Sequence, residues 1–145
     1  MNYTVNDTLV YVLLLTRHIR SGDVPRAILA VLLELGIQPH SDGFSYLRKA
    51  IYEKYCNPDH RLSTVYQAVS QLNNASPDTI LVEQAIRTAI DAAWKNRDDE
   101  IWSLFFQQDK YGRTKRPSNG EFIAQIACLM ELWYGCGKEV CYATK

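Results

Sequence analysis

The feature that most constrains the fold of this chain is a run of apolar residues spaced three and four positions apart between residues 82 and 94. The run consists of Val82, Ala85, Ile86, Ala89, Ile90, Ala93 and Trp94. This spacing places the side chains on one face of an α-helix, whereas a half-buried strand would alternate apolar and polar residues. We therefore predict one long amphipathic helix, with Ser76 as its N-cap and Pro77 in its first turn.

Helical spacing and helix-ending residues recur along the rest of the chain. Asp23 is typical of an N-cap, Gly36 of a C-terminal stop, and Ser118 with Glu121 of a capping box. The other predicted helices span 8–20, 23–35, 43–55, 62–72, 98–105 and 118–133. The pattern predicts an all-α, compact multi-helix domain over residues 1–134, with an extra N-terminal helix over 5–22 and a loose C-terminal tail over 135–145.

Charge and composition exclude some classes of protein to which this chain could belong. The 145 residues carry 16 Lys and Arg against 16 Asp and Glu, so the net charge is zero. This balance excludes a protein that coats nucleic acid over its whole surface, but it leaves room for a local basic patch. Hydrophobic residues make up 47%, which favours a folded core over disorder.

We expect a cytoplasmic protein that does not enter a membrane. The longest apolar run, over 9–15, is too short to span a bilayer, and no basic segment of the kind that opens a secretory signal precedes it. The chain has four cysteines, without a CxxC pair, and we therefore predict reduced thiols. These residues are Cys56, Cys128, Cys136 and Cys141.

The titratable residues show no pattern typical of an enzyme. The three histidines lie in separate segments without a partner at recognisable spacing. The acidic run over 98–100 is more typical of a helix start than of a carboxylate site. Cys56 and His60 are one helical turn apart, but Pro58 between them breaks that geometry. We predict no catalytic residue, no metal site and no cofactor.

The polar side of the long helix is more informative. Its outward residues are Thr79, Ile80, Glu83, Gln84, Arg87, Thr88 and Asp91. Glu, Gln and Arg are the side chains that pair with base edges in the major groove, and a helix–turn–helix places such a helix there. An ordinary amphipathic helix with a hydrated face is the commoner explanation of the same pattern.

A second candidate is the basic loop before the last helix. Its cations are Lys110, Arg113, Lys115 and Arg116, with Asp109 as the adjacent carboxylate. Phosphates are attracted to such a loop, and the helix N-terminus that follows adds backbone N–H donors. The alternative is a solvated loop that keeps the protein in solution.

Several separated motifs resemble one known family. They are Leu35-Gly36-Ile37, Gly43-Phe44, Tyr46-Leu47-Arg48, Val82-Glu83, Ala85-Ile86-Arg87, Ser103-Leu104-Phe105, Lys115, Pro117, Asn119 and Glu121-Phe122-Ile123-Ala124. In this order, over about residues 28–132, they resemble the C-terminal DNA-binding domain of the stage zero sporulation protein A family. The resemblance implies an all-helical effector domain whose helix–turn–helix, here 62–96, binds a short DNA box, often as a tandem dimer.

The resemblance also assigns residues. Glu83 matches a base-contacting glutamate of the family, Arg87 an arginine on its DNA-facing side, and Lys115 lies in a loop near the DNA backbone. The family has arginines where this chain has Leu81 and Gln84. Leu81 cannot donate a hydrogen bond and Gln84 prefers adenine, so each change costs about 1–3 kcal/mol of discrimination at the family's bases.

These observations lead to two hypotheses. In the first, the chain is a stand-alone transcriptional regulator that reads double-stranded DNA with the helix 76–96. The predicted base-facing residues are Glu83, Gln84 and Arg87, and the predicted phosphate-facing residues are Lys95, Arg113, Lys115 and Arg116.

In the second hypothesis, the chain is a protein-interaction module that has kept the fold and lost specific DNA binding. It would act as a co-regulator or inhibitor, of the kind that mobile elements encode. Ile80 and Leu81 would then form the partner surface, because an exposed apolar pair suggests a protein partner. The apolar run over 9–15 is expected to cover the core or, with a slight preference, to form the seam of a homodimer.

Overall fold

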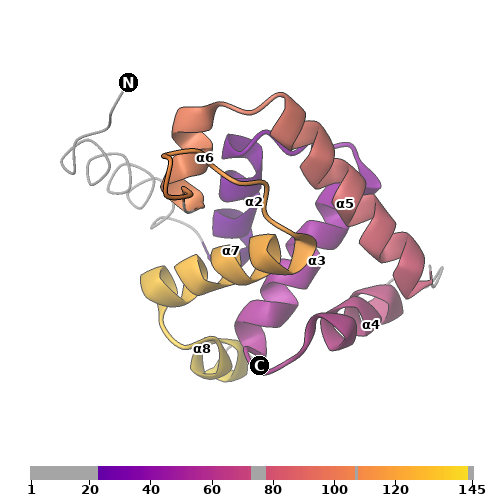
Figure 1. The fold of residues 1–145 in the computed structure, drawn as a ribbon. Helices are drawn as coiled ribbons and strands as arrows, with labels where there is room; N and C mark the ends of the chain where they lie inside the picture. Colours follow the sequence, from indigo (N-terminus) through magenta and orange to yellow (C-terminus); the bar gives the residue numbers. More distant parts are fainter. Residues whose placement is uncertain (1–22, 73–77, 107, 144–145) are drawn as a thin grey trace.

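The structure is a computed structural model that describes residues 23–72, 78–106 and 108–143. These residues form the helices α2 (Val24–Glu34), α3 (Asp42–Cys56), α4 (Leu62–Leu72), α5 (Thr79–Lys95), α6 (Asp99–Phe105), α7 (Asn119–Tyr134) and α8 (Gly137–Ala143) (Figure 1). Within the described residues there is no strand, only an isolated bridge between Gln108 and Thr114. The predicted all-α class is confirmed.

One prediction lies outside the described residues: the N-terminal helix over 5–22 with its homodimer seam. The predicted start of the long helix, with Ser76 as its N-cap and Pro77 in its first turn, is wrong. The described α5 begins at Thr79, and Asp78 acts as its N-cap by accepting a hydrogen bond from the Ile80 N–H at 3.3 Å. In the described part of the chain, no helix has the length and apolar character needed to cross a membrane.

Local signals set several helix ends as predicted. The Asp23 carboxylate accepts a hydrogen bond from the Arg26 N–H at 3.0 Å, which caps α2. Gly36 follows α2 with φ +85°, a conformation that favours glycine. At the start of α7, both hydrogen bonds of the Ser118–Glu121 capping box are present. These signals are read correctly from sequence because each involves neighbouring residues.

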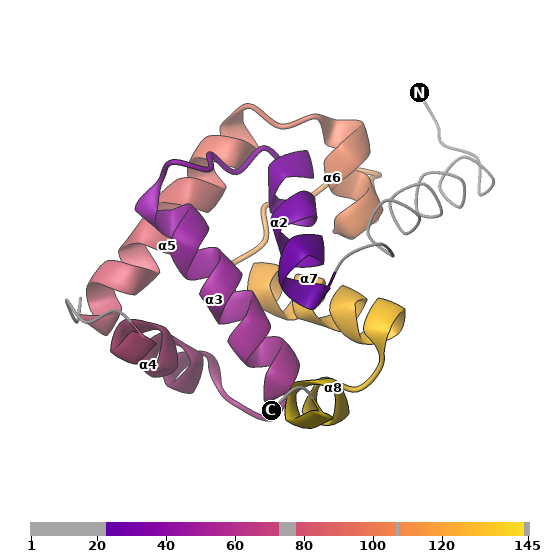
Figure 2. The ribbon, with the colours of Figure 1, turned by 180° about the vertical axis from the view of Figure 1, so that it is seen from behind.

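Helix α3 lies at the centre of the arrangement and contacts α2, α4, α5, α7 and α8 (Figure 1). Seen from behind, α2 lies between α3 and α6 (Figure 2). The core is built from the apolar faces of these helices, with Leu47, Ile51, Ile86, Ile90 and Phe122 fully buried. The predicted apolar face of α5 is therefore the face that packs on α3.

Trp102 of α6 closes one end of this core. It is buried, its Nε1–H donates to the Leu35 carbonyl at 3.1 Å, and its ring centroid lies 6.0 Å from that of Phe122. Trp94, expected on the buried face of α5, is only half-buried. It packs edge-on against Trp102 and carries the Arg97 guanidinium over its ring, with Cζ 3.6 Å from the centroid.

The C-terminal region corrects two predictions. Residues 137–143 are not a loose tail but form α8, which packs on α3 and α7 through Val140 and Cys141. The Tyr55 hydroxyl donates to the Gly135 carbonyl at 3.0 Å, and a disulfide joins Cys56 to Cys141. The prediction of reduced thiols is therefore wrong for this pair, since folding brings together two cysteines that are 85 positions apart.

Candidate nucleic-acid interface

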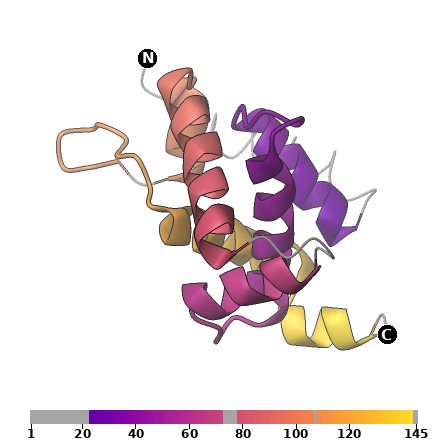
Figure 3. The same ribbon diagram turned by 90° about the vertical axis from the view of Figure 1, so that its right-hand side faces the viewer.

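The candidate interface is the side of α5 that faces away from α3. We call it the outward face of α5 and define it by Ile80, Leu81, Glu83, Gln84, Arg87, Thr88, Asp91 and Lys95, none of which is buried. Helix α5 lies at the front of the view in Figure 3. Helix α4 packs against α5 and precedes it in sequence, as the first helix of a helix–turn–helix does. No described element covers this face.

A groove of ≈ 590 Å³ lies along one edge of the outward face. Leu81, Gln84 and Thr88 line it from α5, and Tyr46 of α3 and His40, which precedes that helix, line it from the opposite side. The bottom of the groove is formed by small residues, Gly43 of α3 with Ala85 and Ala89 of α5, at which the two helices approach each other closely. Gln84, predicted to face a base, thus has an exposed amide with open space beside it.

A second groove lies along the other edge. Glu83, Arg87 and Asp91 line it from α5, opposite Tyr66 and Arg116. Arg87 forms an ion pair with Glu83 one turn earlier, and this hydrogen bond raises the pKa of the Arg87 guanidinium above its ordinary value. Arg87 is thus charged and half-exposed, and its orientation is set by Glu83.

Arg116, predicted to face phosphate, has a structural partner. Its Nε donates to the Asp91 carboxylate at 2.5 Å, and its Nη1 donates to the Pro117 carbonyl at 2.7 Å. The guanidinium therefore joins the loop before α7 to α5. Part of its charge is balanced by Asp91, so Arg116 positions neighbouring groups as well as adding positive charge to this edge.

Asn119 lies at the bottom of the second groove. This residue is buried, and its Nδ2 donates to the Tyr66 hydroxyl at 3.2 Å and to the Glu83 carbonyl at 3.1 Å. The amide thereby ties α7 to both α4 and α5. Burial raises the pKa of the Tyr66 hydroxyl, and the hydrogen bond from Asn119 opposes that effect in part. Sequence reasoning assigned Asn119 to a motif but did not predict this role, because neither partner is near it in the chain.

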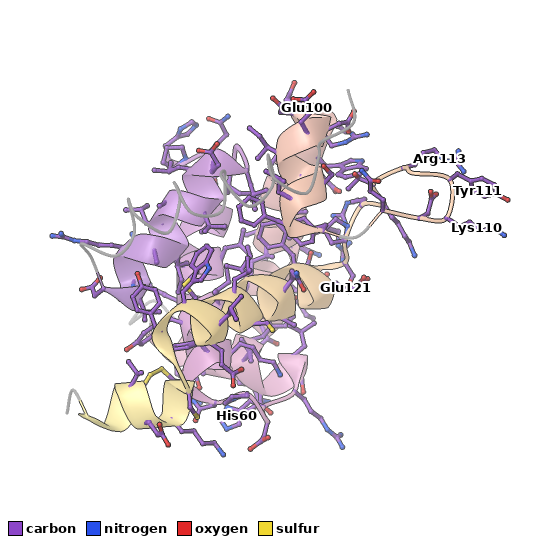
Figure 4. The ribbon with its side chains drawn as sticks, turned by 90° about the vertical axis from the view of Figure 1, so that its left-hand side faces the viewer. His60, Glu100, Lys110, Tyr111, Arg113 and Glu121 are labelled. Carbon is purple, nitrogen blue, oxygen red and sulfur yellow. A yellow bond between two sulfur atoms is a disulfide. The ribbon has the colours of Figure 1, made fainter. Side chains whose placement is uncertain are left out.

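The remaining predicted phosphate contacts lie at two separate places. Lys95 is exposed at the C-terminal end of α5. Arg113 and Lys115 are exposed on the loop that follows α6, and this loop projects from the body of the molecule (Figure 4). The structure therefore brings Glu83, Arg87 and Arg116 together at one edge of α5, but it does not bring Arg113 to them.

Ile80 and Leu81, the predicted partner surface, lie at the N-terminal end of the outward face. They are 59% and 55% exposed, which is unusual for large apolar side chains. They occupy the part of α5 that a helix–turn–helix presents to base edges.

One known family matches most of the chain. Residues 28–130 match a family model described as the C terminal of sporulation initiation factor Spo0A. The matched span covers more than half of the 145 residues, from α2 to α7, and includes the whole of α4 and α5. Helix α8 lies beyond the matched span.

Proposed function

The chain belongs to the family of the Spo0A C-terminal domain, a DNA-binding effector domain of sporulation, and from this premise we propose that it is a transcriptional regulator that reads double-stranded DNA with the outward face of α5. The observation that carries the proposal is the openness of that face. Gln84 and Arg87 are both exposed, between two grooves and on a helix whose opposite face is buried.

The chemistry of these side chains suits base recognition. An amide such as Gln84 pairs with the N6 and N7 edge of adenine, and a guanidinium such as Arg87 with the O6 and N7 edge of guanine. Glu83 can accept from the N4 amine of cytosine when it also holds Arg87 in place. Leu81 can offer no hydrogen bond to a base.

Contacts to the DNA backbone would come from the edges of the interface. Lys95 is exposed at one end of α5, and Arg116 lies beside Arg87 in the second groove. Arg113 and Lys115 are predicted to meet phosphates farther from this face. Each phosphate neutralised by such a cation releases counterions, so affinity should fall as salt concentration rises.

A selection from random duplexes, followed by affinity measurements over a range of salt concentrations, tests the proposal. We expect an enriched motif and a linear loss of log affinity with log salt concentration. Arg87→Ala should cost about 1–3 kcal/mol and relax the preference at one base position. Lys115→Ala should weaken binding to all sequences alike.

Arg26→Ala is the matched control, since it removes an exposed arginine from α2, away from α5. This variant should bind as the unaltered protein does. If selection enriches no motif and no duplex shows salt-dependent binding, the regulator proposal is overturned.

The exposure of Ile80 and Leu81 favours a second candidate, the protein-interaction module. Leu81→Ser separates the two. On the DNA proposal this variant keeps its affinity for DNA, because Leu81 donates no hydrogen bond to a base. If the chain is an interaction module, Leu81→Ser should weaken binding to the protein partner. Salt concentration and Arg87→Ala should then have little effect on that binding.

A further inference from the structure

The loop between α6 and α7 ends in a turn that is held in place by its own hydrogen bonds. We call residues 108–116 the wing. The Asp109 N–H donates to the Arg113 carbonyl at 2.7 Å, and the Asp109 carboxylate accepts from the N–H groups of Tyr111 and Arg113, each at 2.9 Å. Gly112 provides the positive φ of +77° that this tight turn requires. The turn is therefore preorganised, so binding a ligand there costs less ordering.

The tip of the wing presents an aromatic ring between two cations. Tyr111 is 69% exposed. The Lys110 Nζ and the Arg113 Cζ lie 5.2 and 5.3 Å from its ring centroid (Figure 4). Arg113 also has an ion pair with Asp109 at 3.4 Å, which is within the turn. Lysine, arginine and a tyrosine hydroxyl are groups that contact phosphate oxygens in protein–DNA complexes.

The base of the wing is fixed to α5. The ion pair between Arg116 and Asp91 joins the two segments, and the adjoining Pro117 is buried. In Figure 1 the wing runs in front of α6 and α2, while α5 forms the opposite edge of the molecule; in Figure 3 it projects sideways from α5. The tip of the wing therefore lies to the side of α5 and away from the body of the molecule.

We infer that the wing is a second DNA-contacting element, which holds the phosphodiester backbone of DNA flanking the box read by α5 through Lys110, Tyr111 and Arg113. The inference rests on the proposed function, because α5 must first place the duplex. Since the wing lies to the side of α5, the flanking DNA bends toward the body of the protein to reach it, as DNA does on other proteins that contact it over an extended surface.

Duplex length tests the inference. Two probes are compared: one carrying the selected box alone, and one extended by about two helical turns, ~20 base pairs, on each side. We expect the unaltered protein to bind the long duplex more tightly. The double variant Lys110→Ala/Arg113→Ala should lose this preference and bind both duplexes as the unaltered protein binds the short one. Its salt slope on the long duplex should fall by about 1.8, since each phosphate contact contributes ~0.9.

The double variant Arg26→Ala/Arg48→Ala is the charge-matched control, because both arginines are exposed on α2 and α3. It should keep the preference for the long duplex. Hydroxyl-radical footprinting gives a second readout. Protection of the DNA outside the box should be present with the control and absent with Lys110→Ala/Arg113→Ala, the wing variant. A circular dichroism spectrum and a melting curve show whether each variant is folded.

The outcomes separate the two proposals. If the wing variant keeps the long-duplex preference and the flanking protection, the inference about the wing is wrong, while loss of binding in Arg87→Ala would still support the role of α5. If the unaltered protein binds both duplexes equally, the inference about the wing is also overturned. If neither duplex binds, both proposals fail.

Discussion

Gly43 sets how closely α3 and α5 can approach. A Cβ atom at this position would lie 2.3 Å from the Ala85 carbonyl oxygen and 2.6 Å from the Ala89 Cβ. Both distances are shorter than van der Waals contact, and the first involves backbone that cannot rotate away. The close approach makes the floor of the groove beside Gln84, so this glycine shapes the candidate interface without facing solvent.

We expect Gly43→Ala to lower the free energy of unfolding by about 1–3 kcal/mol, the usual cost of overpacking a core. Chemical denaturation monitored by circular dichroism measures this change. Gly120→Ala is the control, because its Cβ would meet only the end of the Leu62 side chain, at 3.3 Å. Equal stability of the two variants would show that α3 and α5 can separate at little cost.

At the scale of elements, the start of α7 fixes the positions of α4 and α5. Ser118 caps the helix, Asn119 ties it to α4 and α5, and Glu121 completes the capping box. Hydrogen bonds from the Ser118 side chain and backbone lower the pKa of the Glu121 carboxyl from its ordinary value of 4.5. The charged form is favoured in the folded protein, as expected for a carboxylate near a helix N-terminus.

This shift predicts a pH dependence of stability. Because the folded pKa is lowered, the contribution of Glu121 is fully present above its unfolded pKa and is lost as the pH falls through the lowered folded value. The melting temperature of the unaltered protein should exceed that of Glu121→Gln at pH 7, and the difference should shrink below about pH 4.5, the ordinary value. Melting curves over a series of pH values measure it.

Glu131→Gln provides the comparison for that experiment. Glu131 lies in the last turn of α7, where the helix dipole disfavours negative charge. This variant should not lose stability at pH 7 in the way that Glu121→Gln does. If both variants melt alike over the whole pH range, the position of the carboxylate on α7 has no effect and the prediction is contradicted.

For the molecule as a whole, the disulfide between Cys56 and Cys141 connects α8 to the central helix. It closes a loop of 85 positions, and α8 lies outside the span that matches the family. A cross-link over such a separation stabilises mainly by restricting the unfolded chain. The ion pair of Lys138 with Asp59, at 2.9 Å, adds a contact to the connection that leads into α4 and lowers the pKa of the Asp59 carboxyl.

We expect Cys141→Ser to lower the free energy of unfolding by about 2–4 kcal/mol in non-reducing buffer. A dithiol reductant should remove most of the difference from the unaltered protein. Cys128→Ser, which alters an exposed free thiol, should have no such effect. Denaturation curves with and without reductant measure the change. Equal stability of Cys141→Ser and the unaltered protein without reductant would contradict the prediction.

The amino-acid sequence by itself determined the all-α class, most helix ends and the apolar face of α5. The physical reason is that caps, glycine stops and three-to-four spacing act between residues within a turn or two of one another. Ser118 with Glu121 and the face around Ile86 were predictable on this basis.

Tertiary structure alone decided which residues meet across the fold. Arg116 and Asp91 are 25 positions apart, Asn119 and Tyr66 are 53 apart, and Cys56 and Cys141 are 85 apart. No local pattern marks these pairs, because the packing of α4, α5, α7 and α8 on α3 brings them together. The same packing separates Arg113 from Arg116 in space, although they are neighbours in sequence, since one lies on a projecting turn and the other is bonded to α5.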